Sequence, residues 1–323
     1  MATDSVKTQT ATRKAFTGEI ERLAHDDDRI CVVTSDAKGS VTLKEFEKHL
    51  PNQFVEVGIA EQNAVGIGAG LANSGRSVFV CGPACFYSAR AIEQVKNDVA
   101  YAGSNVIIVA VSGGVAYGAL GSTHHSLHDI AVYRAIPEVQ IVLPSDARQT
   151  EWATRALAEC GGPAYMRLGR NPVPDIYTEE TPDFRLGRAH RLRSGSDITI
   201  VATGETVHHA VTATEHLAAE GIQADLLDLH TIKPFDRDAV LSSVSRTGAV
   251  VTVEEHSVHG GLGAAVAEVL SQELPRPMRV LGFPDEFLVA GSGAELFEHY
   301  GISADGIAVA ARDLLHAGPK MEK

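Results

Sequence analysis

The chain has 323 residues, of which 44% are hydrophobic, and it carries a formal net charge of -13 at pH 7. This apolar content is enough for two domains with cores of their own, while the acidic balance excludes nucleic acid and anionic membranes as natural partners. No apolar stretch approaches the roughly 20 residues of a spanning helix, and the N-terminal segment lacks the apolar core of a signal peptide, so we expect a cytoplasmic protein.

The first half of the chain alternates short strands and helices. After a loose tail at 1–10, the hydrophobic pattern predicts strands at 29–35, 77–81, 105–111, 140–143 and 164–167, and helices at 11–24, 60–74, 88–101, 127–135 and 146–160. A polar loop at 36–40 follows the first strand, as loops do at the end of a parallel strand. Such alternation is typical of a doubly wound, mostly parallel sheet.

A composition break at 171–193 separates this part from the rest. The segment holds Pro172, Pro174 and Pro182, many charges and no periodicity, which predicts an interdomain linker. A second unit over 194–316 follows, before a tail at 317–323. Its strands are expected at 198–202, 224–229, 249–254 and 278–281, and its helices at 206–220, 237–244, 261–272 and 304–315. The predicted fold class is therefore α/β, with two doubly wound domains.

The segment from Phe54 to Asn73 places one acid, Glu61, in an apolar and glycine-rich setting. Small residues follow Glu61 at positions that allow close packing, which predicts a carboxylate at the start of a tightly packed helix. One interpretation is a surface acid that suits the helix dipole. The other is a functional site, because a carboxylate in a dry seam needs a partner or a chemical role.

Three histidines, His124, His125 and His128, follow a glycine-rich loop at 113–122. On a helix His124 and His128 could share a metal ion, but no third ligand is evident beyond Asp129. The favoured interpretation is a loop that places a histidine over a polar substrate.

The segment VGIAEQNAVGIGAGLA, which contains Glu61, resembles the DVGIAEQHAV segment of thiamine-diphosphate enzymes of the transketolase and deoxyxylulose-phosphate synthase family. The resemblance extends from about Ala11 to about Leu315. It implies a pyrimidine-binding domain over 11–170 and a smaller, mixed-sheet transketolase C-terminal domain over 194–316. In that family the glutamate of this segment hydrogen-bonds the cofactor's pyrimidine, so Glu61 is implied as a catalytic and cofactor-binding residue.

The resemblance implies further residues that contact the cofactor. In the segment CFYSARAIEQVKND, Tyr87 matches an aromatic residue that packs on the aminopyrimidine, with Phe86 as the neighbouring alternative. Arg90 aligns with a polar position of the deoxyxylulose synthases. Asp36 matches an acid that lies near the thiazolium ring.

The loop GALGSTHHS resembles the family's G-x-D-G-x-T-H-Q loop, in which the histidine contacts a substrate oxygen. His124 matches that histidine and is implied as a catalytic donor or proton shuttle. Leu120 replaces the acid that contacts a sugar hydroxyl in the family, and His125 replaces the glutamine. The lost acid predicts an altered substrate specificity.

Arg13 in ATRKAF, Ser40 in TSDAKGS and Arg170 in MRLGRN also resemble segments of this family. Alone, each would be interpreted as a solvated charge or a helix cap. Together they imply a clamp for the phosphate or other anionic end of the substrate, because guanidinium groups match phosphate oxygens.

The family binds the cofactor's diphosphate through a metal held by a G-D-G motif and a downstream asparagine, and the sequence contains no such motif. We therefore expect the second subunit of a split transketolase, with no metal ligands of its own. It would transfer ketol units between sugar phosphates or related ketoses only with a partner subunit. The partner would carry the diphosphate-binding domain and hold Mg or Ca, and the two subunits would share thiamine diphosphate in a heterotetramer.

Three alternatives stay open from the sequence. The chain could be a 2-oxo acid dehydrogenase beta-type subunit or a deoxyxylulose-phosphate-synthase-like half. It could be a carboligase of specialised metabolism that takes an unusual ketose or keto acid. It could also be a non-catalytic scaffold that keeps the fold.

Overall fold

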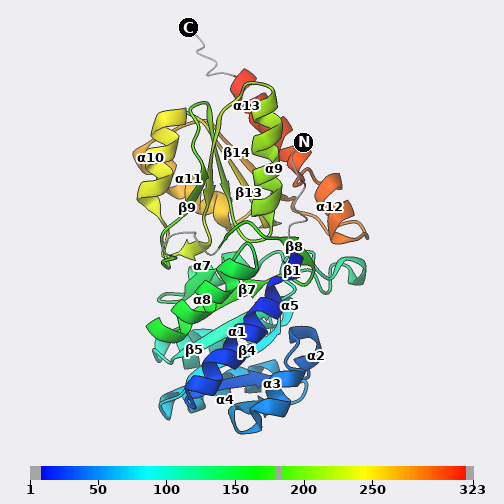
Figure 1. Ribbon diagram of the computed structural model, residues 1–323, viewed down its shortest axis with the longest axis vertical. Coiled ribbons are helices and arrows are strands. Elements are labelled where there is room, and N and C mark those ends of the chain that lie inside the picture. Colours follow the sequence, from blue (N-terminus) through cyan, green and yellow to red (C-terminus); the bar gives the residue numbers. More distant parts are fainter. Residues whose placement is uncertain (1–8, 179–183, 318–323) are drawn as a thin grey trace.

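The computed structural model describes residues 9–178 and 184–317. Two α/β units follow one another along the long axis, with the N-terminal unit below the C-terminal unit in Figure 1. In the described part of the chain, no helix combines the length and apolar character needed to cross a membrane.

The N-terminal unit is built on a seven-stranded sheet with the order β12-β6-β7-β5-β4-β2-β3. Its strands are β2 (Ile30–Thr34), β3 (Phe54–Glu56), β4 (Ser77–Pro83), β5 (Val106–Val111), β6 (Gln140–Val142), β7 (Ala164–Leu168) and β12 (Thr231–Lys233). All neighbours pair in parallel except β12, which runs antiparallel to β6. Strand β12 comes from the C-terminal half of the sequence, so this pairing joins the two units.

Helices cover both faces of this sheet because its central strands are apolar on both sides. In β4, Val78 and Val80 pack toward α4 (Glu61–Asn73), while Phe79 and Cys81 pack toward α1 (Thr12–Asp26) and α8 (Ala147–Cys160). This is the burial pattern of a doubly wound parallel sheet. Residues that follow the strands are thereby brought together at one edge, beyond the carboxyl ends of the strands.

The C-terminal unit has a five-stranded mixed sheet with the order β14-β13-β10-β11-β9, in which β9 is antiparallel. The strands are β9 (His190–Arg193), β10 (Ile198–Ala202), β11 (Ala224–Asp228), β13 (Val250–Ser257) and β14 (Met278–Phe283). Helices α9 (Thr206–Ala219) and α13 (Ala304–Ala317) pack together, and α10 (Arg237–Thr247) lies with α11 (Leu262–Glu273) on the other side of the sheet (Figure 1). The predicted fold class, two α/β units with a mixed second sheet, is confirmed.

The predicted tail and linker differ from the structure at their edges. Residues 9 and 10 belong to β1 (Gln9–Ala11), which pairs with β8 (Pro172–Pro174) inside the segment expected to be a linker. Strand β9, at the other end of that segment, joins the C-terminal sheet. Prolines at an edge pairing of this kind give no strand signal, because they cannot donate to a ladder. Residues 1–8, 179–183 and 318–323 lie outside the described residues.

Five other segments also differ from the prediction. The range expected to form one helix at 88–101 holds α6 (Ile92–Gln94) and a π-helix at Val95–Tyr101, with α5 (Ala84–Tyr87) just before it, and α2 (Lys38–Val41) overlaps the polar loop at 36–40. Helix α7 (Asp129–Ala135) starts two residues late. Two short helices, α3 (Lys44–His49) and α12 (Gly293–His299), were not predicted. Elements of one or two turns are too short to show a hydrophobic period.

Candidate active site

A cleft lies beyond the carboxyl ends of β2, β3, β4 and β5, the edge at which open α/β sheets bind ligands. It is lined by Ser35, Asp36, Ala37, Ser40, Ile59, Glu61, Pro83, Phe86, Tyr117, Leu120 and His124. Five of these residues are site residues predicted from the sequence: Asp36, Ser40, Glu61, Phe86 and His124. The fold therefore brings together predicted residues from distant parts of the N-terminal unit.

Glu61 is the first residue of α4, and it is only 3% exposed although it lines an open cleft. Arg90 Nη1 donates to Glu61 Oε2 at 2.8 Å, and the Arg90 guanidinium lies 4.6 Å from the centre of the Phe86 ring. The Arg90 side chain is half exposed. The cleft thus holds a carboxylate that is shielded from water beside an aromatic ring. The partly solvated guanidinium of Arg90 contacts both groups.

The two aromatic candidates are placed differently. Tyr87 is fully buried beneath Gly82, where a Cβ atom would lie 2.4 Å from its ring, and its hydroxyl lies 3.0 Å from Ser35 Oγ. Burial raises the pKa of Tyr87. Phe86 lines the cleft, so its ring is the one that a ligand in the cleft would meet, and Tyr87 supports the wall from behind. This placement favours Phe86, the neighbouring alternative named from the sequence, as the aromatic face of the cleft.

The three histidines have separate partners. His124 lies edge-on to the rings of Phe86 and Tyr117, and its Nδ1 is 3.0 Å from Thr123 Oγ1. His125 is buried and donates from Nε2 to the Gly118 carbonyl at 3.0 Å. His128 Nε2 lies 3.2 Å from Ser88 Oγ. Among residues 9–178 and 184–317, no group of three or more His, Cys, Asp or Glu residues could hold a metal ion.

The guanidinium groups of Arg13 and Arg170 lie beside the cleft, and each has an N–H group that is not used in a hydrogen bond to the described residues. Arg13 Nη1 donates to the Ser40 carbonyl at 2.5 Å, and the Arg170 guanidinium lies 5.2 Å from the Tyr117 ring centre. Burial and the positive charge of Arg170 lower the pKa of Arg13, while Tyr117 opposes this. Arg13 Nε and Arg170 Nη1 are buried and find no acceptor in the described part of the chain. An anion between the two groups would relieve both the repulsion and the missing hydrogen bonds.

Asp36 is exposed at the rim of the cleft, with a left-handed backbone at φ 52°. Its backbone N–H donates to Glu56 Oε1 at 2.7 Å, and Gly58 donates to the same oxygen at 3.0 Å. Sequence reasoning missed Glu56, which fixes this rim, and Tyr117, which lies between His124 and Arg170. The only signal for Tyr117 was a lone aromatic residue inside a glycine-rich loop.

The chain is similar to two family models and to several single proteins. Residues 8–175 match the transketolase pyrimidine binding domain, and residues 187–307 match the transketolase C-terminal domain. The chain is 55% identical over 305 residues to one of the subunits of an apulose-4-phosphate transketolase from Phocaeicola vulgatus, covering 94% of this chain and 97% of that one. It is 40% identical over 302 residues to 6-deoxy-6-sulfo-D-fructose transketolase subunit SqwH of a Clostridium species, covering 94% of both chains.

The same similarity holds in three dimensions. A solved structure described as a split gene transketolase, inactive beta4 tetramer, superposes with a TM-score of 0.86 at 39% sequence identity. The match covers 96% of this chain and 99% of that chain.

Proposed function

This chain belongs to the transketolase family, and from that premise we propose that it is the second subunit of a split transketolase, which transfers a ketol unit from a ketose to an aldehyde. The family resemblance stated from the sequence is confirmed. Two relatives that match over nearly their whole length are named as subunits, and this supports a divided enzyme.

The observation that carries the proposal is the pairing of Glu61 and Phe86 in one cleft. A carboxyl that is 3% exposed and an aromatic face beside it suit a flat, nitrogen-containing ring, so the residues present fit the pyrimidine of thiamine diphosphate. Glu61 and Phe86 would hold that ring, with Asp36 at the rim. When bound, the cofactor supplies the nucleophilic carbon that takes up the ketol unit.

The chain's own groups have distinct tasks in this proposal. The Glu61 carboxyl is kept from water and exchanges a proton with a ring nitrogen. When the Thr123 hydroxyl donates to His124 Nδ1, the ring proton is on Nε2, which is left to donate to a substrate oxygen. Arg13 and Arg170 bind the anionic end of the substrate through their unpaired N–H groups, and the Ser40 segment fixes Arg13.

We assign the diphosphate and its Mg or Ca ion to a partner subunit. The sequence contains no G-D-G motif, and the described residues include no set of three metal ligands. The assembly would then be a heterotetramer, with two copies of each chain and the cofactor between unlike chains. The Leu120 side chain, 55% exposed at the cleft, favours a substrate other than the ordinary sugar phosphates.

The test is reconstitution with the subunit that carries the diphosphate-binding domain. Ketol transfer from a panel of ketose phosphates should require both chains, and Glu61→Ala should lower kcat roughly 10²- to 10⁴-fold in the assembled enzyme. Activity of this chain alone, or full activity of Glu61→Ala, would contradict the proposal and favour a scaffold. Turnover only with a 2-oxo acid and an oxidative acyl acceptor would favour the dehydrogenase alternative.

A further inference from the structure

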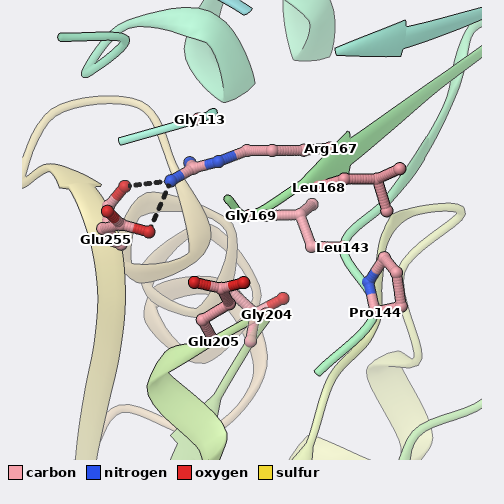
Figure 2. A pocket seen from close by; sticks show the side chains of 10 residues that line it. Gly113, Leu143, Pro144, Arg167, Leu168, Gly169, Gly204, Glu205 and Glu255 are labelled. Atoms are coloured by element: carbon pink, nitrogen blue, oxygen red, sulfur yellow. Dashed lines mark hydrogen bonds and ion pairs between the residues drawn. The ribbon is translucent and has the colours of Figure 1, made fainter. Parts of the chain in front are cut away.

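A second, smaller cavity lies in the seam between the two units and holds three charged side chains (Figure 2). Arg167 enters from β7, Glu255 from β13, and Glu205 from the residue before α9. Arg167 Nη2 donates to Glu255 at its carbonyl, 2.7 Å away, and at Oε2, 3.1 Å away. Figure 2 shows Glu205 opposite this pair, on the other side of the cavity. The pair of Arg167 and Glu255 is satisfied, and Glu205 is a second carboxyl group beside it.

Glu205 instead reaches the N-terminal unit. Thr12 Oγ1 donates to Glu205 Oε1 at 3.5 Å, and the Gly169 N–H donates to Thr12 Oγ1 at 2.8 Å. A Cβ atom on Gly169 would lie 1.5 Å from Glu205 Oε1, so only glycine lets the carboxyl approach this backbone. One hydroxyl therefore links α1, the end of β7 and the C-terminal unit.

The two residues joined by this hydrogen bond stand directly before the two arginines of the proposed anion clamp in the sequence. Thr12 is followed by Arg13, and Gly169 is followed by Arg170. We infer that Glu205 is a positioning residue for this clamp: through Thr12 it holds the two arginine-bearing segments at a fixed separation, and it does so in its neutral form. The inference rests on the proposed function, because that function assigns the clamp to the substrate's anionic end.

The charges around Glu205 explain why the neutral form is the one that fits. Glu255 of β13 and Arg167 of β7 face it, Asp129 of α7 lies behind Arg167 with Oδ1 3.5 Å from Nη1, and the uncharged Thr12 faces it from α1. Burial and the negative charge of Glu255 raise the pKa of Glu205 to about 8, against the opposing effects of Arg167 and Thr12.

Ionisation would therefore change the seam above about pH 8. A negative Glu205 is attracted toward Arg167, and it places a charge behind the clamp that repels a bound anion. Anion affinity should fall as the pH rises through this range, with no change in the arginines themselves.

Sulfate binding to the full-length chain tests the inference, because sulfate stays a dianion throughout this pH range and both arginines are on this chain. We expect the sulfate Kd, measured by titration calorimetry, to rise about tenfold between pH 7 and pH 9 in the wild type. Glu205→Gln, which imitates the neutral carboxyl, should bind as tightly at pH 9 as at pH 7. An equal pH slope in both proteins would overturn the inference.

If Glu205→Gln does not fold, variants of Thr12, the hydrogen-bond partner of Glu205, still test the inference. Thr12→Val keeps the side-chain shape but removes the hydroxyl, so it should weaken sulfate binding at both pH values, whereas Thr12→Ser should restore it. Glu159→Gln, at an exposed glutamate of α8 that does not line this cavity, is the matched control and should keep the wild-type slope. Wild-type sulfate affinity in Thr12→Val would contradict the inference.

Two further variants separate the inference from the proposed function. Arg13→Met and Arg170→Met should each remove sulfate binding. If both variants and the wild type bind sulfate equally, or if none binds it, the clamp itself is wrong and the inference falls with it. If the arginine variants lose sulfate while Glu205→Gln keeps the wild-type slope, the clamp stands and only the role of Glu205 fails.

Discussion

The guanidinium of Arg90 donates a 2.8 Å hydrogen bond to the buried carboxylate of Glu61. One partner is 50% exposed and the other 3%, so the pair lies between a surface ion pair, worth under about 1 kcal/mol, and a buried one, whose disruption costs about 3–5 kcal/mol. The same guanidinium lies over Phe86. Any ring that uses both Glu61 and Phe86 must therefore share them with Arg90 or displace it.

A double-mutant cycle on Glu61 and Arg90 measures this contact directly. We expect Arg90→Met alone to destabilise the chain by about 1–2 kcal/mol, because it leaves the Glu61 carboxylate without its partner. In a Glu61→Gln background the same change should cost under about 0.5 kcal/mol. Urea unfolding of the four proteins gives the coupling, and equal costs in both backgrounds would show that the pair contributes nothing to stability.

Phe86 and Tyr87 are adjacent, and the structure predicts opposite effects for them. Phe86→Leu should leave the unfolding free energy within about 0.5 kcal/mol of wild type, because Phe86 is only partly buried, and should lower the activity of the assembled enzyme at least tenfold. Tyr87→Phe should keep activity but lose about 1 kcal/mol of stability with its contact to Ser35. Urea unfolding and activity measurements on both variants test this prediction. The reverse pattern would show that Tyr87, and not Phe86, stacks on the cofactor ring.

These two aromatics show what sequence reasoning could and could not reach. Periodicity located the long elements, and the segment around Glu61 placed one acid at the first residue of α4. Helix α5 has only four residues, so no period reveals which of Phe86 and Tyr87 faces the cleft. Strand β12 was missed for a related reason, because its three residues pair with β6 from a different half of the chain.

Glu205 left no local signal at all. Its contact with Thr12 spans 193 positions, and its neighbourhood, TGET, resembles any turn before a helix. Composition and spacing report on local structure and on burial, whereas a carboxyl in a seam between two units depends on tertiary packing alone.

The pH dependence of stability offers a second, independent measurement on Glu205. Its pKa is raised from 4.5 to about 8 in the folded chain, so between these values the native state keeps a proton that the unfolded chain has lost. The contribution of Glu205 to stability should therefore fall as the pH rises from about 4.5 to 8 and level off above that range. Glu205→Gln should reduce this slope in urea unfolding at several pH values.

Asp228 contributes to the remaining slope. Burial raises its pKa to about 7, in the same direction, so Glu205→Gln should flatten the profile only in part. Asp228→Asn is the matched change at a site bonded instead to Tyr177 and Gln149, and it should remove the part of the slope that this carboxyl contributes below pH 7. A profile that Glu205→Gln leaves unchanged between pH 5 and 8 would show that this carboxyl ionises normally.

Leu120 is the residue on which substrate choice can be tested. Its side chain is 55% exposed in the cleft that also holds His124, so an acid there would meet the substrate and not the core. Leu120→Asp should leave stability within about 0.5 kcal/mol of wild type. It should shift the ratio of kcat/KM values roughly 10- to 100-fold toward substrates that present a hydroxyl at that position, because an aspartate accepts the hydrogen bond that leucine cannot.

The comparison needs a control that separates hydrogen bonding from charge. Leu120→Asn accepts the same hydrogen bond without a negative charge near the Arg13 and Arg170 clamp, so it should shift specificity in the same direction with a smaller rise in KM for phosphorylated substrates. Competition assays between hydroxylated and deoxy substrates in the assembled enzyme give the ratio. If both variants keep the wild-type preference, Leu120 does not contact the reacting sugar.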